Sequence, residues 1–114
     1  MIRDWLGFDV HRNWQAQTAE GGADLVGIPG WAVEVKRAKQ PRINEWWEQT
    51  AEQASRYGAR PALLYRLDGQ GRGLPSLDKW KAVVRLWDVS TRVSGDHLCE
   101  MTLRAWMEVV RETV

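Results

Sequence analysis

A proline–glycine pair in the first third of the chain constrains the fold more tightly than any other feature. Pro29 and Gly30 separate an apolar run at residues 23–28 from residues 31–37, in which apolar and polar side chains alternate. Pro-Gly is a strong turn pair, and such alternation is typical of a β-strand with one buried face. The sequence therefore predicts a β-hairpin over residues 23–37.

Strand and helix patterns alternate along the rest of the chain. Further strands are expected at residues 8–12, 61–67, 80–88 and 97–101. One helix is expected from its N-cap Asn44 to Gly58, and another after its N-cap Thr102. Four apolar residues of the second helix recur at i, i+3, i+4 and i+7, namely Leu103, Trp106, Met107 and Val110. We predict one α/β domain over residues 1–114, with a glycine-rich loop at residues 68–78.

The composition is ordinary for one globular domain with a single hydrophobic core. The chain has 114 residues, of which 44% are hydrophobic and 27% are charged. No apolar run approaches the roughly 18 residues that cross a bilayer, and no secretory segment is recognisable, so a cytoplasmic location without membrane contact is expected. The only cysteine, Cys99, excludes an internal disulfide and is expected in the core, as are most of the eight tryptophans.

Positive charge is clustered rather than abundant. The formal net charge is only +1, so a contact with DNA must come from local groups of cations. Four cations and no acid lie between residues 36 and 42, and Arg12, Arg56 and Arg60 are candidates to join them in space. The residues predicted to bind DNA are Arg12, Arg37, Lys39 and Arg42.

The second strand of the hairpin carries the candidate chemistry. Side chains alternate between the two faces of a strand, so Glu34 and Lys36 point the same way and their valine neighbours point into apolar packing. Mg²⁺ prefers hard oxygen ligands, which Asp24, Glu34 and the main-chain carbonyl of Val35 can supply. These three residues are the predicted metal ligands, and Lys36 is predicted to position the attacking water or to offset phosphorane charge.

The metal site sets a condition on the register of the hairpin. A strict two-residue loop at Pro29-Gly30 would pair Leu25, and not Asp24, with Glu34. An L-proline followed by glycine favours turns that fit two-residue hairpins poorly, so a longer loop or a bulge is expected. We therefore predict a register shifted by one residue, which sets Asp24 opposite Glu34.

The segment GGADLVGIPGWAVEVKRAKQ, at residues 21–40, resembles the hairpin of the PD-(D/E)XK nuclease superfamily, and more narrowly that of phage and archaeal Holliday junction resolvase-like endonucleases. The likeness extends from Phe8 to about Asp88. It implies a restriction-endonuclease-like mixed β-sheet flanked by helices. It also implies that Asp24 and Glu34 bind Mg²⁺, which Mn²⁺ is expected to replace, and that Lys36 assists the nucleophile.

Two accessory features accompany this resemblance. Gln53 and Tyr57 fit a Q-x-x-x-Y pattern that some relatives carry on the helix after the lysine. The family usually begins with a longer helix bearing an acid, whereas seven residues precede Phe8 here. Asp4, a partner subunit or Glu20 could supply that carboxylate, and Glu20 is the preferred candidate.

Three functions remain open from the sequence. They are a magnesium-dependent DNA endonuclease acting on branched DNA, a catalytically weak or inactive DNA-binding module on the same fold, and a plain interaction domain. Symmetric cutting of a junction needs two active sites, so the first predicts a homodimer with tryptophans at its interface. His11 and His97 lack zinc-hydrolase spacing, and no P-loop or dinucleotide motif suggests a nucleotide cofactor.

Overall fold

The computed structural model describes residues 11–12, 25–26, 28–69, 79–90 and 97–113. Its strands are β1 (His11–Arg12), β2 (Leu25–Val26), β3 (Trp31–Ala38), β4 (Arg60–Leu67), β5 (Lys81–Arg85) and β6 (Leu98–Thr102). Its helices are α3 (Ile43–Tyr57), α5 (Leu86–Val89) and α6 (Leu103–Thr113). Within these residues the strands form one mixed sheet in the order β1-β2-β3-β4-β5-β6, in which only β3 and β4 run parallel. The α/β class is therefore correct.

The predicted hairpin is present as β2 and β3. The main-chain N–H of Trp31 donates to the carbonyl of Ile28 at 3.2 Å, and Gly30 adopts φ of 80°, a conformation that glycine accepts without strain. The paired residues are Leu25 and Val33. A strict two-residue loop would not produce this pairing, so the predicted one-residue shift of register is confirmed for these residues.

Helix α3 connects the parallel strands β3 and β4. It ends as predicted at Gly58, which has φ of 61° and donates its N–H to the carbonyls of Ala54 and Ser55. The prediction that Asn44 is the N-cap is wrong, because the helix begins at Ile43 and its cap residue Arg42 forms no side-chain capping bond. The apolar strand expected at residues 61–67 is β4, in the middle of the sheet.

The strand expected over residues 80–88 ends earlier than predicted. β5 stops at Arg85, and the short helix α5 follows it. The guanidinium of Arg85 donates to the carboxylate of Asp88 at 2.8 Å and lies 4.7 Å from the ring centroid of Trp87. This spacing of three residues suits a helical turn and not an extended strand.

Helix α6 forms as the sequence predicts. The hydroxyl of Thr102 accepts the main-chain N–H of Ala105 at 3.1 Å, which is the bond expected of an N-cap. The predicted stripe of Leu103, Trp106, Met107 and Val110 is fully buried. The strand expected at residues 97–101 is β6, displaced by one residue.

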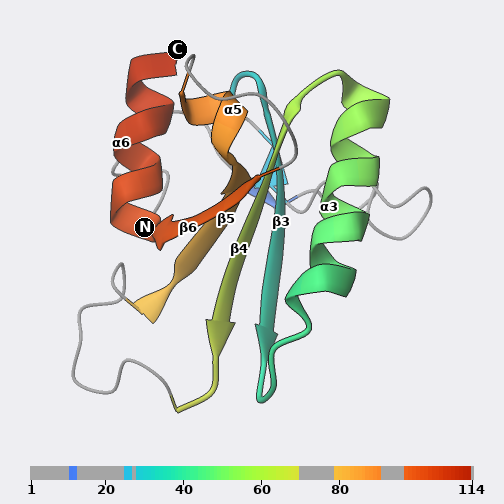
Figure 1. The fold of residues 1–114 in the computed structure, drawn as a ribbon, viewed down its shortest axis with the longest axis vertical. Coiled ribbons are helices and arrows are strands. Elements are labelled where there is room, and N and C mark those ends of the chain that lie inside the picture. Colours follow the sequence, from blue (N-terminus) through green and yellow to red (C-terminus); the bar gives the residue numbers. More distant parts are fainter. Residues whose placement is uncertain (1–10, 13–24, 27, 70–78, 91–96, 114) are drawn as a thin grey trace.

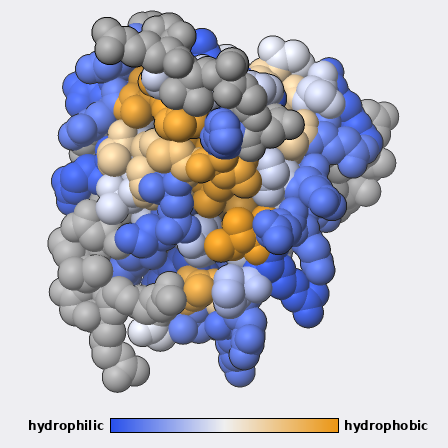
Figure 2. Space-filling view, viewed as in Figure 1, coloured by the Kyte–Doolittle hydropathy of each residue, from blue (hydrophilic) through white to orange (hydrophobic). Residues whose placement is uncertain are grey.

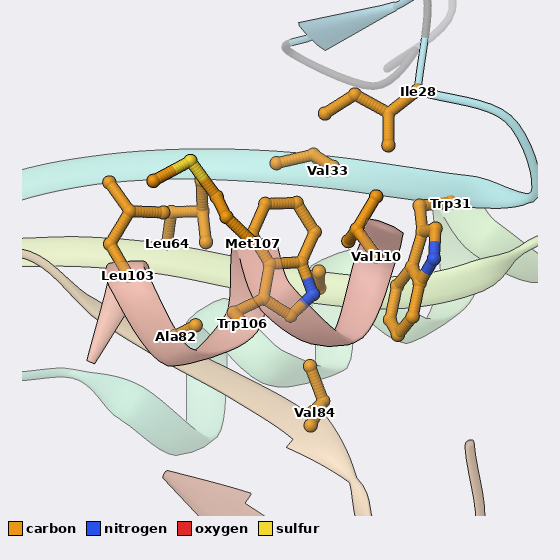
Figure 3. Close-up of a cluster of buried hydrophobic side chains, with 11 residues drawn as sticks. Ile28, Trp31, Val33, Leu64, Ala82, Val84, Leu103, Trp106, Met107 and Val110 are labelled. Atoms are coloured by element: carbon orange, nitrogen blue, oxygen red, sulfur yellow. The ribbon is translucent and has the colours of Figure 1, made fainter. Parts of the chain in front are cut away.

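Helices α3 and α6 cover opposite faces of the sheet (Figure 1). On the α6 face, the buried stripe of the helix meets apolar side chains from three strands, with Trp106 in the middle of the cluster (Figure 3). The strand residues in that cluster are Trp31, Val33, Ala62, Leu64, Ala82 and Val84. On the α3 face, Trp46 packs with Leu63, Tyr65, Leu67 and Val83. Alternation along each strand therefore supplies two separate apolar clusters.

The tryptophans described by the structure lie mostly inside, as predicted. Three are buried, two are half-buried and Trp87 is 38% exposed. Cys99 is half-buried against the cluster on the α6 face. Of the helices in the described residues, none has the length and apolar character needed to cross a membrane.

Candidate active site

Glu34 and Lys36 point to the α3 face of the sheet, as predicted from strand alternation. The Nζ atom of Lys36 lies 3.4 Å from Oε1 of Glu34. The Glu34 side chain is 8% exposed and that of Lys36 is 29% exposed. Val33 belongs to the apolar cluster on the other face, and Val35 packs against that cluster. One strand thus separates a charged pair from the apolar cluster under α6.

Glu34 is unusually enclosed for a carboxylate. Acids are seldom buried unless a partner compensates their charge, and the ammonium of Lys36 provides one such partner. The neighbour of Glu34 on β4 is Leu63, which is fully buried. A nearly buried carboxylate paired with a lysine makes this position a candidate functional site.

Other predicted site residues fall outside the described part of the chain. These are Asp24 and Glu20, together with Asp4. Arg12 belongs to β1, but its side chain is not described. Among the described residues there is no group of three His, Cys, Asp or Glu side chains that could hold a metal ion. The described residues therefore contribute Glu34 and the Val35 carbonyl to the predicted metal site, and they do not complete it.

An open pocket of about 420 Å³ lies beside Lys36. Its other wall is the exposed side of α3, where Glu45, Glu48 and Glu52 recur at helical spacing. The remaining lining residues are Arg42, Trp46 and Gln49. The lysine is therefore accessible from a groove that is acidic on the helix side.

The predicted Q-x-x-x-Y residues do not line this pocket. Gln53 is half-buried, and Tyr57 is 55% exposed near the C-terminal end of α3. The glutamine that does line the pocket is Gln49, one helical turn earlier. The spacing of residues in the sequence does not indicate which of these two turns of α3 faces the pocket.

The basic cluster predicted near Lys36 is only partly assembled. Arg37 forms an exposed ion pair with Asp68 at 3.1 Å, Lys39 is exposed, and Arg42 lies 4.0 Å from Glu45. The suggestion that Arg60 joins this cluster is wrong, because Arg60 pairs with Trp31 at the opposite end of β3 and its guanidinium lies 5.6 Å from that ring centroid.

Arg56 does not join the basic cluster either. It is in the last turn of α3, where its guanidinium bonds Glu52 at 2.6 Å. That turn leads through Gly58 to the start of β4, which is the end of the sheet away from Lys36. Of the cations that the sequence predicted to cluster, those described near Lys36 are thus the ones at residues 37–42.

The structure adds one buried polar group that the sequence did not indicate. Tyr65 is the β4 neighbour of Lys36, is 6% exposed, and donates its hydroxyl to Oε1 of Glu100 on β6. Burial, and then the hydrogen bond and negative charge of Glu100, raise the pKa of Tyr65 above its ordinary value of 10.0. The phenol therefore remains a proton donor at physiological pH.

Comparison with known proteins adds no assignment. No family model matches the chain, and no curated protein matches its sequence. A function for this site therefore has to be argued from its own residues.

Proposed function

We propose that the chain is a magnesium-dependent endonuclease that hydrolyses phosphodiester bonds in DNA, with Glu34 and Lys36 in its active site. The observation that carries this proposal is the enclosed Glu34 carboxylate, 3.4 Å from the Lys36 ammonium and on the face opposite the apolar cluster under α6. Phosphodiester hydrolysis needs a carboxylate for a divalent cation and a positive charge near the transferred phosphoryl group.

The hairpin register supports a second carboxylate at the same site. Leu25 is paired with Val33, and a pairing that continues by one residue toward the N-terminus would set position 24 opposite Glu34. Paired residues of antiparallel strands point to the same face of the sheet. The register is thus the one that the proposal requires of Asp24, although Asp24 lies outside the described residues.

The proposed roles follow from charge and position. Asp24, Glu34 and the main-chain oxygen of Val35 would hold magnesium, which when bound supplies Lewis acidity and a water of lowered pKa. The ammonium of Lys36 lies beside Glu34 at the border of an open pocket, where it would orient the attacking water and balance charge on the phosphoryl oxygens. Mn²⁺ is expected to substitute for Mg²⁺.

The proposed substrate is branched DNA, and the proposed assembly is a homodimer. The groove beside Lys36 is open and mixed in charge, and the net charge of +1 gives no general affinity for duplex DNA. A junction cut on two strands needs two active sites, which one copy of this domain does not provide. These finer statements rest on the resemblance of residues 21–40 to resolvase-like nucleases.

A cleavage assay tests the proposal directly. A labelled four-way junction, a flap and a linear duplex of the same sequence are incubated with the protein in Mg²⁺, Mn²⁺ or EDTA. Cleavage is expected in either metal, strongest on the branched substrates, and absent in EDTA. Glu34→Gln is expected to lower the cleavage rate at least about 100-fold, and Lys36→Ala by a similar factor.

A matched control variant distinguishes a loss of cleavage activity from a loss of folding. Glu108→Gln neutralises an exposed acid of α6 on the opposite face and is expected to cleave like the wild type. Circular dichroism checks that each variant is folded. Binding of the junction without metal-dependent cleavage would overturn the nuclease proposal in favour of a DNA-binding module. Absence of both binding and cleavage would favour an interaction domain. A monomeric mass in light scattering would contradict the resolvase form.

A further inference from the structure

A row of side chains crosses the α3 face of the sheet at the level of Lys36. The registers pair Lys36 with Tyr65, Tyr65 with Lys81, and Lys81 with Thr102. Residues paired in this way share a face, and Tyr65 packs with Trp46 of α3, which identifies that face. Neighbouring strands lie about 4.8 Å apart, so Lys81 is about 10 Å from Lys36 across β4.

The two helices leave this part of the sheet unequally covered. Helix α3 packs chiefly on β3 and β4, whereas α6 packs from the other side against residues of β3, β4 and β5. Figure 2 shows hydrophilic side chains over both helices and hydrophobic ones gathered between them. On the α3 side of β5, Val83 is buried with Trp46 of the helix, whereas Lys81, two residues earlier, is half-buried.

Lys81 is one of several cations that form no ion pair with an acid in the described residues, together with Lys39, Arg60, Arg66 and Lys79. Within the described residues, five cations form ion pairs with acids: Lys36, Arg37, Arg42, Arg56 and Arg85. Lys81 and Lys39 lie on either side of Lys36, one across the sheet and one beyond the end of β3.

An approach to Lys36 along helix α3 is unfavourable for a polyanion such as DNA. Glu45, Glu48 and Glu52 line the helix side of the pocket, with only Arg42 among them as a cation. Like charges repel at this range, so a DNA backbone lying along α3 would lose affinity. A backbone crossing the sheet meets the ammonium groups of Lys81, Lys36 and Lys39 instead.

We infer that Lys81 binds a backbone phosphate of the DNA, about one to three nucleotides from the phosphate at Lys36. This inference rests on the proposed function for the site at Lys36. The span of about 10 Å between the two lysines matches a few nucleotide steps of 3.4 Å rise. Glu100 is exposed on β6, and its carboxylate accepts the hydroxyl of Tyr65, the residue paired with both lysines.

Two substitutions of opposite sign test the path. Lys81→Gln removes a cation and is expected to weaken binding about five- to tenfold, and to lower the slope of log K against log salt by about one. Glu100→Gln removes the acid and is expected to tighten binding about two- to threefold. The measurement is fluorescence anisotropy with a labelled four-way junction in Ca²⁺, over a range of salt concentrations.

Arg104→Gln is the matched control, because it removes one positive charge from the exposed side of α6 on the opposite face. Its dissociation constant is expected to stay within about twofold of the wild type. Equal losses in Lys81→Gln and Arg104→Gln would overturn the inference, since the effect would then be bulk charge. Wild-type binding by Lys81→Gln would overturn it as well.

Cleavage kinetics separate this inference from the proposed function. In Mg²⁺, Lys81→Gln is expected to raise KM with kcat within about twofold of the wild type, because it removes binding and not chemistry. If the wild type cuts no DNA but Lys81→Gln still loses affinity and salt dependence selectively, the phosphate contact stands and the nuclease proposal fails. If the wild type cuts and Lys81→Gln has an unchanged KM, the nuclease stands and the contact fails.

Discussion

The two faces of the sheet are built from the same strands but differ in chemistry. On the α6 face, β3 contributes Trp31 and Val33 to a cluster closed by Trp106 of the helix. On the α3 face, the same strand contributes Glu34 and Lys36. One strand thus carries apolar packing on one side and a charged pair on the other, because each residue step reverses the face.

The largest expected effect tests whether the apolar cluster on the α6 face dominates the free energy of unfolding. Trp106 is fully buried and its ring lies edge-on to Trp31, with centroids 5.6 Å apart. Trp106→Ala is expected to lower the free energy of unfolding by about 3–5 kcal/mol, measured by urea denaturation. Trp87→Ala is the control, with an expected loss below about 1 kcal/mol because Trp87 is 38% exposed. Equal losses would contradict the assignment of the core.

The second effect concerns the charged pair on the other face. Lys36→Met keeps the side-chain length but removes the ammonium 3.4 Å from the enclosed Glu34. The free energy of unfolding is expected to fall by about 2 kcal/mol, since a buried carboxylate loses a partner. The double variant with Glu34→Gln is expected to regain at least half of that loss. No loss in Lys36→Met would show that other groups satisfy Glu34 without the lysine.

A smaller effect is expected at Tyr65. Tyr65→Phe removes the hydrogen bond to Glu100 and is expected to cost about 1 kcal/mol at neutral pH. Because folding raises the pKa of Tyr65, its contribution is complete below its ordinary value of 10.0 and is lost as the pH rises above that value. Urea denaturation from pH 7 to 11 should show a steeper alkaline loss in wild type than in Tyr65→Phe. Parallel curves would contradict the raised pKa.

The smallest effect tests an ion pair outside both clusters. Arg37 and Asp68 are 61% and 42% exposed in their side chains, so solvent screens their attraction. Asp68→Asn is expected to change the free energy of unfolding by less than about 0.5 kcal/mol in thermal or urea denaturation. A loss of stability as large as that of Lys36→Met would contradict the expectation that the exposed ion pair stabilises the fold less than the enclosed one.

Patterns that depend on neighbours in sequence were predictable. The buried stripe of α6 and its Thr102 cap follow from spacings of three and four residues, and the turn at Gly30 follows from the Pro-Gly pair. The common face of Glu34 and Lys36 follows from alternation alone. Each of these features is set by backbone geometry over a few residues.

Features that depend on contacts across the sheet were not predictable. The run at residues 61–67 was predicted only as an apolar central strand, and nothing local pairs Tyr65 with Glu100, which lies 35 residues away and two strands over. The end of β5 at Arg85 was missed because apolar residues continue through Leu86 and Trp87. The N-terminal end of α3 was misplaced because a capping preference is weaker than the packing of the helix on β3 and β4.

The pairing of Leu25 with Val33 depends on the number of residues that connect β2 to β3. Adding or deleting one residue there would shift the pairing of β2 with β3 by one position, so that Leu25 would turn from the α6 face to the α3 face. A three-nucleotide insertion or deletion would thus change which side chains β2 presents to each helix, with no charged codon altered.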